Sequence, residues 1–160
     1  MRTEANSAYY DGAAPRPLAE LLACPPGVGD VLNGSAECIN FDAGDTLFRQ
    51  SNACRGLYLV ISGQLLCKAE RMDARLTLGT ARAGDLVELA AALGDGLHTY
   101  TLVAQTSGSV LILPIDALKR AFQDYPRLRM QLLEELAREV SRAYAVSCGA
   151  RLGGARRRSN

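Results

Sequence analysis

Short apolar runs, separated by turns rich in glycine and aspartate, fill the chain between about Glu37 and Leu113. The runs read CINF, LYLVI, QLLCKAE, RLTLGTA, YTLVAQT and SVLILPI, and the turns read DAGD, SGQ, ARAGD and TSGS. Many short strands at close, regular spacing are typical of an antiparallel sandwich or barrel. Gly44 can take a positive φ at no steric cost, and Ser62-Gly63 lies between two strand-like runs as a tight hairpin would. The pattern therefore predicts a mainly β domain.

A helical period replaces the β pattern after Pro114. The run DALKRAFQDYP predicts a helix that Asp116 caps and Pro126 ends. A longer helix is predicted over 127–149, with a one-sided apolar stripe made of Leu132, Leu133, Leu136, Val140, Ala143 and Tyr144. Such a stripe either packs on the sheet or pairs with the same helix of a second chain. The length and terminal position of the helix favour a homodimer.

Both ends of the chain are polar. The N-terminal residues are small and polar, which predicts a loose arm, and the run LAELL from Leu18 predicts a short helix that Cys24-Pro25-Pro26 stops. The C-terminal end carries four arginines without apolar periodicity, which favours a solvated tail over a nucleic-acid contact. The predicted organisation is a flexible arm at 1–17, a β-roll domain at 18–126, a dimerisation helix at 127–149 and a basic disordered tail at 150–160.

Composition limits the possible classes of protein. A chain of 160 residues with 48% hydrophobic side chains suits one domain with a real core. The net charge of +1 gives no general attraction to nucleic acid or to an anionic membrane. No stretch has the apolar length of a signal peptide core or a membrane helix, so the expected compartment is the cytoplasm. The five cysteines form no CxxC pair, which predicts reduced thiols.

The order of these elements resembles the sensor half of the Crp-Fnr-like transcription regulators. The resemblance rests on FDAGDTLFRQSNACRGLYLVISGQLLCKAE, ARAGDLVELAAALGD and HTYTLVAQTSGSVLILPIDALKRAF, and it covers roughly residues 18–147. It implies an antiparallel double-stranded β-helix (a jelly roll or β-roll) with flanking helices, followed by a long C-terminal dimerisation helix. Complete regulators of this type continue into a helix-turn-helix module. This chain stops about a dozen residues after Cys148, so we expect no direct sequence-specific DNA binding from it.

The resemblance also implies a candidate ligand pocket. In members that bind cyclic nucleotides, a Gly-Glu-Leu cassette places its Glu on the ribose hydroxyl and helical amides on the phosphate, and an Arg-Ser or Arg-Thr pair follows on the next strand. Val87 here replaces the glycine that lets the backbone approach the phosphate, and His98 replaces the fixed cation. A cyclic nucleotide is therefore one candidate effector, with an altered phosphate side. The candidate pocket residues are Gly84, Val87, Glu88, Leu89, His98 and Thr99.

Several alternatives stay open for these residues. A second alignment compares GDLVEL with the GDLLGL-like segment of members that sense redox state or gases, and Glu88 then stands where a small residue usually does. Glu88 is otherwise a solvated side chain, and His98 is either a half-exposed strand residue or an axial haem ligand. The scattered cysteines favour buried structural thiols over an iron–sulfur cluster.

We expect a regulatory sensor domain and not an enzyme, because the chain has one histidine, no metal-spaced ligands and no phosphate loop. Signal-responsive control of transcription through dimerisation is the expected role, with a small-molecule effector in the roll. The alternative is a ligand-free protein-interaction module or a degenerate regulator.

Overall fold

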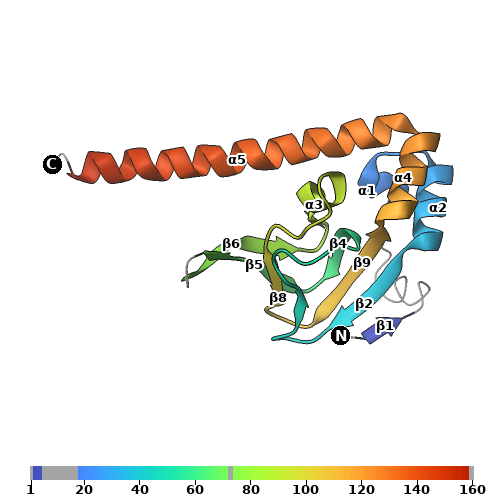
Figure 1. Ribbon diagram of the computed structural model, residues 1–160, viewed down its shortest axis with the longest axis horizontal. Coiled ribbons are helices and arrows are strands. Elements are labelled where there is room, and N and C mark those ends of the chain that lie inside the picture. Colours follow the sequence, from blue (N-terminus) through green and yellow to red (C-terminus); the bar gives the residue numbers. More distant parts are fainter. Residues whose placement is uncertain (1, 5–17, 72–73, 159–160) are drawn as a thin grey trace.

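A computed structural model describes residues 2–4, 18–71 and 74–158, and only the backbone of 2–4, 71, 74–76 and 143–158. Two antiparallel sheets pack face to face, and helices cover one end and one side of them (Figure 1). The five-stranded sheet has the order β1 (Arg2–Glu4), β2 (Glu37–Phe41), β9 (Gly108–Pro114), β4 (Gly56–Ser62) and β7 (Leu86–Val87). The four-stranded sheet has the order β3 (Thr46–Phe48), β8 (Thr101–Ala104), β5 (Gln64–Arg71) and β6 (Ala74–Arg82). The helices are α1 (Leu18–Leu22), α2 (Pro26–Ser35), α3 (Leu89–Leu93), α4 (Ile115–Asp124) and α5 (Pro126–Arg158).

Two apolar clusters form the core, one on each face of the five-stranded sheet. Along β4, Leu57 and Leu59 face the helices, whereas Tyr58 and Val60 face the second sheet. This alternation follows from the two-residue period of a strand. The mainly β fold class is confirmed, and each of the six apolar runs contributes a strand.

The turn at Gly63 differs from the predicted hairpin. β4 pairs with β7 and β9, whereas β5 pairs with β6 and β8, so Gly63 carries the chain from one sheet to the other. Its φ is +86°, and a Cβ atom there would lie 2.7 Å from the carbonyl oxygen of Ser107. Glycine is required at this crossing by both the backbone conformation and the close approach of another segment.

One of two proline-linked predictions is confirmed and the other was wrong. Helix α1 ends at Leu22, before Cys24-Pro25-Pro26, and α2 then begins at Pro26, where a missing amide donor costs nothing. Asp116 does not cap α4: the helix begins at Ile115 after Pro114, and Asp116 lies inside its first turn. A carboxylate in that turn still interacts favourably with the helix dipole.

The predicted boundaries at both ends also need correction. Residues 2–4, expected within a flexible arm, form β1 and pair with β2, while the rest of 1–17 lies outside the described residues. The long helix does not end at 149: α5 runs to Arg158, so most of the expected disordered tail continues its backbone. Gly149 was taken as a helix end, but α5 contains it together with Gly153 and Gly154, each at a cost of only about 1 kcal/mol, and the residues between and after them are mainly strong helix formers.

Helix α5 carries two different apolar stripes instead of the single one predicted. Leu128, Leu132 and Leu136 pack into the core on the helix side of the sheet. Met130, Leu133, Ala137 and Val140 form a second, outer stripe, in which Met130 is 56% and Val140 61% exposed. The outer stripe is spaced by three, four and three residues, as in a coiled-coil seam. Ala143 and Tyr144, predicted for the stripe, have side chains outside the described part of the chain.

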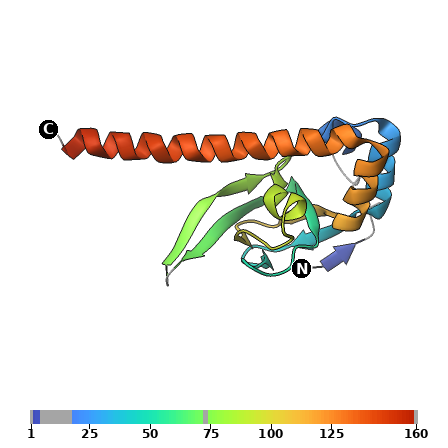
Figure 2. The same cartoon turned by 45° about the horizontal axis from the view of Figure 1, so that its top comes forward.

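Figure 2 shows α5 lying above the β5–β6 hairpin and continuing well past the roll. Among the described residues, no helix combines the length and the apolar character needed to cross a membrane.

Candidate functional site

Glu88 occupies an unusual backbone position between β7 and α3. Its φ of 73° and ψ of 36° place it in the left-handed region, which favours glycine. The residue precedes the first turn of α3, yet its carboxylate makes no capping bond to that helix. The side chain turns inward instead, and the whole residue is only 3% exposed.

The Glu88 carboxylate is fully occupied by protein donors. Its Oε2 atom lies 2.7 Å from Nδ1 of His98 and accepts a bond of 2.9 Å from the Thr99 amide. Its Oε1 atom accepts a bond of 2.6 Å from the Thr99 hydroxyl. The side chains of His98 and Glu88 are 2% and 0% exposed. A buried carboxylate is stable only with such compensation, so this group is unavailable to a ligand while the cluster is intact.

Aromatic rings hold the imidazole of His98 in place. It stacks on Phe48 with ring centroids 3.7 Å apart and planes 5° apart, and the edge of Tyr58 lies against it at 6.0 Å. Backbone bonds fix the segment as well, because the Ser51 amide donates to the carbonyl of His98 and the His98 amide donates to that of Asn52. The ring is therefore clamped between its aromatic and acidic neighbours.

Tyr100 connects this cluster to a thiol. Its hydroxyl accepts a bond of 3.2 Å from the Glu88 amide, and it also bonds to the side chain of Cys67. Burial raises the pKa of Tyr100, and the nearby Cys67 and Glu88 raise it further, so the phenol stays neutral.

Cys67 should be a slow nucleophile in the folded protein. Burial raises the pKa of its thiol from 9.0 to about 11. A higher pKa leaves less thiolate at any pH below it, by about 100-fold for two units, and the thiolate is the reactive form. Iodoacetamide labelling followed by peptide mass spectrometry should show far slower modification of Cys67 in the native chain than in urea. Equal rates in the two conditions would contradict this assignment.

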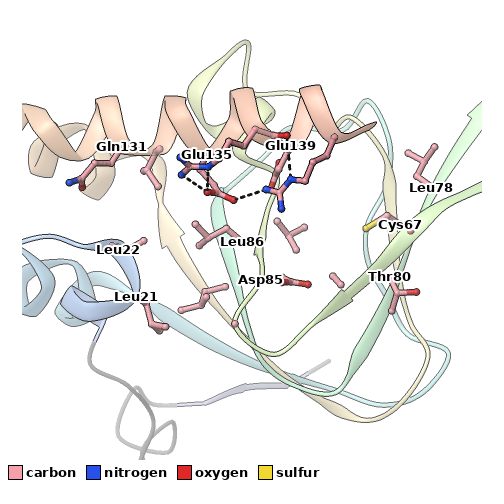
Figure 3. Close-up of a pocket in the computed structure, with 18 of the residues that line it drawn as sticks. Leu21, Leu22, Cys67, Leu78, Thr80, Asp85, Leu86, Gln131, Glu135 and Glu139 are labelled. Atoms are coloured by element: carbon pink, nitrogen blue, oxygen red, sulfur yellow. Dashed lines mark hydrogen bonds and ion pairs between the residues drawn. The ribbon is translucent and has the colours of Figure 1, made fainter. Parts of the chain in front are cut away.

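A groove of about 720 Å³ separates the roll from α5 (Figure 3). Its roll side is formed by β6, β7 and Tyr100, and its opposite side by one face of α5. Leu22 of α1 closes one end, and Leu78, 58% exposed, lies at the other. A ligand in the groove would touch the roll and the long helix at once.

The charged lining of the groove is mainly acidic. Asp85 from the roll faces Glu135 and Glu139 of α5, and the two arginines present, Arg138 and Arg142, both bond to Glu135 (Figure 3). Lost hydration, reinforced by the charge of Glu135, raises the pKa of Glu139. The bonds from Arg138 and Arg142 lower the pKa of Glu135. No described lining cation is left without an acidic partner to receive a phosphate.

The candidate pocket residues divide into three groups. Gly84 and Val87 line the groove. Glu88 and His98 form a buried pair behind it, the exposed Thr99 donates two bonds to Glu88, and Leu89 packs in the apolar core on the helix side. Sequence reasoning missed other residues of the groove, namely Cys67, Tyr100 and those of α5. Strand and helix patterns do not show which side chains face each other across a gap.

Two open readings of the cluster were wrong. Glu88 is not a solvated side chain, and His98 is not half-exposed: it lies before β8 and is 4% exposed. The positive φ falls on Glu88 and not on Val87. That position agrees with the alignment in which Glu88 stands where a small residue is usual. Across the described residues, no group of three potential metal ligands comes together.

The sequence profile of the cyclic nucleotide-binding domain family matches residues 38–125. The chain belongs to this family. The matched range includes the buried cluster, α4 and the two sheets, with β1 alone outside it. The profile therefore covers the roll that carries the groove. The resemblance seen in the sequence is thereby confirmed.

Solved structures show the same fold for this cyclic nucleotide-binding domain. A cyclic nucleotide-binding domain from Methylobacillus flagellatus superposes with a TM-score of 0.72 at 16% identity, covering 88% of this chain and 82% of that one. The sensor domain of the transcriptional regulator DNR from Pseudomonas aeruginosa has a TM-score of 0.68 at 22% identity, covering 81% of this chain and 87% of that one.

A longer relative shares the domain as a small part. The lysophospholipase NTE1 of Eremothecium gossypii is 29% identical over 107 residues, which is 66% of this chain. This chain spans only 7% of the length of that protein.

Proposed function

We propose that this domain is a regulatory sensor that works as a homodimer through α5, in signal-responsive control of transcription in the cytoplasm. The observation that carries the proposal is the outer stripe of α5, formed by Met130, Leu133, Ala137 and Val140. These side chains point away from the core that holds Leu132, and their heptad spacing suits a second copy of the same helix. The burial of the Glu88–His98 pair supports a regulatory over a catalytic role.

The effector site in this proposal is the groove between the roll and α5. A molecule that touches both walls favours one placement of α5 over another, and the dimer then reports the change. The acidic excess of Asp85, Glu135 and Glu139 favours a neutral or cationic effector with apolar parts over an anionic nucleotide. The apolar walls at Leu22 and Leu78 would bury those parts.

Two features argue against a cyclic nucleotide as the effector. The Glu88 carboxylate, which the family resemblance assigns to the ribose, is already bonded to His98 and Thr99. His98, in place of the arginine, has its Nδ1 atom on Glu88 and cannot make the bidentate contact of a guanidinium. Reaching the Glu88 carboxylate or Nδ1 of His98 requires breaking a buried pair, which costs several kcal/mol.

Calorimetric titration with cyclic AMP and cyclic GMP tests this assignment. We expect no binding tighter than about 1 mM, with a cyclic-AMP-binding member of the family as the positive control. Titrations at about pH 6 and about pH 8 cover both protonation states of a histidine. Micromolar binding at either pH would contradict this assignment and identify the domain as a nucleotide sensor. A monomeric chain that binds no neutral or cationic compound in a thermal-shift screen would instead support a ligand-free interaction module.

A further inference from the structure

A second cavity, of about 210 Å³, lies in the roll away from the groove. Its walls come from β2, β3, β4 and the loop between β3 and β4, and His98 forms part of its lining. No lining residue of this cavity also lines the groove. Its apolar side is made of Ile39, Leu47 and Phe48. The cavity is therefore a separate compartment with an aromatic and aliphatic wall.

Two buried side chains bring unpaired polar atoms to this cavity. Tyr58 is 3% exposed and its hydroxyl bonds to no described residue. His98 has one ring nitrogen, Nδ1, on Glu88, while Nε2 has no partner in the described part of the chain. Burial raises the pKa of Tyr58 to about 12, so its hydroxyl is a donor at neutral pH. Neither atom is among the fully buried side-chain atoms that lack a partner, so both are accessible and can bond to a molecule held in the cavity.

The rim of the cavity adds positive charge. Arg49 is exposed and forms no ion pair within the described residues, and Arg55 beside it bonds to Glu37. The rim loop is held by backbone bonds, since the Asn52 amide donates to the carbonyl of Arg49 and the His98 amide donates to that of Asn52. These bonds fix the backbone of the rim, and Arg49 is part of the cavity lining.

We propose that this cavity binds a small aromatic carboxylate. The ring fits against Ile39, Leu47 and Phe48, and the carboxylate accepts from the Tyr58 hydroxyl and the Arg49 guanidinium. His98, whose Nδ1 atom lies on the Glu88 carboxylate, forms another part of the cavity wall. Sites for drug-sized ligands measure roughly 300–1,000 Å³. A cavity of about 210 Å³ accordingly selects a single-ring ligand.

Calorimetry with benzoate, in a buffer free of other carboxylates, tests the proposal. Benzoate should bind, whereas benzamide, of the same size without the charge, and acetate, with the charge but no ring, should bind at least tenfold more weakly. Tyr58→Phe removes one hydroxyl and keeps the ring, and it should weaken benzoate binding about tenfold or more. Arg49→Gln should weaken it about threefold, because that side chain is exposed.

Matched variants separate this cavity from other sites. Tyr125→Phe removes a tyrosine hydroxyl and Arg127→Gln removes an exposed arginine, both outside the lining, and neither should change the affinity for benzoate. Arg138→Gln alters the groove and should also leave it unchanged. Equal binding of benzoate and benzamide, no detectable binding of benzoate, or a loss with Arg138→Gln that exceeds the loss with Tyr58→Phe overturns the proposal. The proposal does not depend on dimerisation or on the groove.

Discussion

Replacing Glu88 by alanine should lower the free energy of unfolding by about 3–5 kcal/mol. The substitution leaves Nδ1 of the buried His98 without its partner beside a side chain that is 0% exposed, and it also removes the acceptor of the exposed Thr99. Each buried donor that loses its acceptor costs about 1–3 kcal/mol. Urea denaturation of the purified variant, followed by far-ultraviolet circular dichroism, measures the loss directly.

Two further variants identify the cause of this loss. Glu134→Ala removes an exposed glutamate from α5 and should change stability by less than about 0.5 kcal/mol. Glu88→Gln keeps the shape of the side chain, with its oxygen accepting from His98 and the Thr99 amide and its NH2 group donating to the Thr99 hydroxyl, so it should cost only about 1 kcal/mol. If Glu88→Ala proved as mild as Glu134→Ala, the cluster would not be a stabilising element of the roll.

A glutamate at Val140 should weaken dimerisation by at least about 100-fold. Val140 is 61% exposed in the single chain and belongs to the outer stripe with Met130, Leu133 and Ala137. In a dimer through this stripe, the new carboxylate would be buried without a partner, and the cost of several kcal/mol corresponds to this loss of affinity. Sedimentation equilibrium over a range of protein concentrations gives the dissociation constant.

The neighbouring residue provides the control for this experiment. Ser141 is exposed and lies outside the outer stripe, so Ser141→Glu adds the same charge to the same turn and should leave the dissociation constant nearly unchanged. A wild-type chain that sediments as a monomer at every concentration would refute the homodimer. Equal weakening by both substitutions would point to charge repulsion between chains and not to a seam at Val140.

The six strands that come from the apolar runs were predictable because each run carries a local signal, whereas the short strands β1, β3 and β7 were not predicted. Runs such as LYLVI combine β-branched or bulky apolar residues with glycine at their ends, and β4 forms at that place. Which strands pair is a non-local property, and the turn at Gly63 shows the difference. The turn at Ser62-Gly63 was correctly located, but the close approach to Ser107 that accompanies the crossing to the other sheet involves a distant segment.

The site was only partly predictable, for a similar reason. The sequence placed Glu88 and His98 in one pocket, and the structure brings them together at 2.7 Å. Their burial depends on Phe48 and Tyr58, which come from other strands. Comparison with a nucleotide-binding pattern treated His98 as a replaced cation facing a ligand. Its actual partner is the glutamate of the same pattern, and no pattern of single residues contains that pairing.

The two stripes of α5 make the helix a lever. Its first turns are fixed to the core by Leu128 and Leu132, while the groove lies under the middle of the described part and the backbone continues to Arg158 (Figures 1 and 2). From Leu132 to Arg158 the rise of a helix gives an arm of about 39 Å. A tilt of the helix by about 5° about Leu132 therefore moves its far end by about 3 Å. Small changes in the groove become displacements at the C-terminal end that are as large as the diameter of a water molecule.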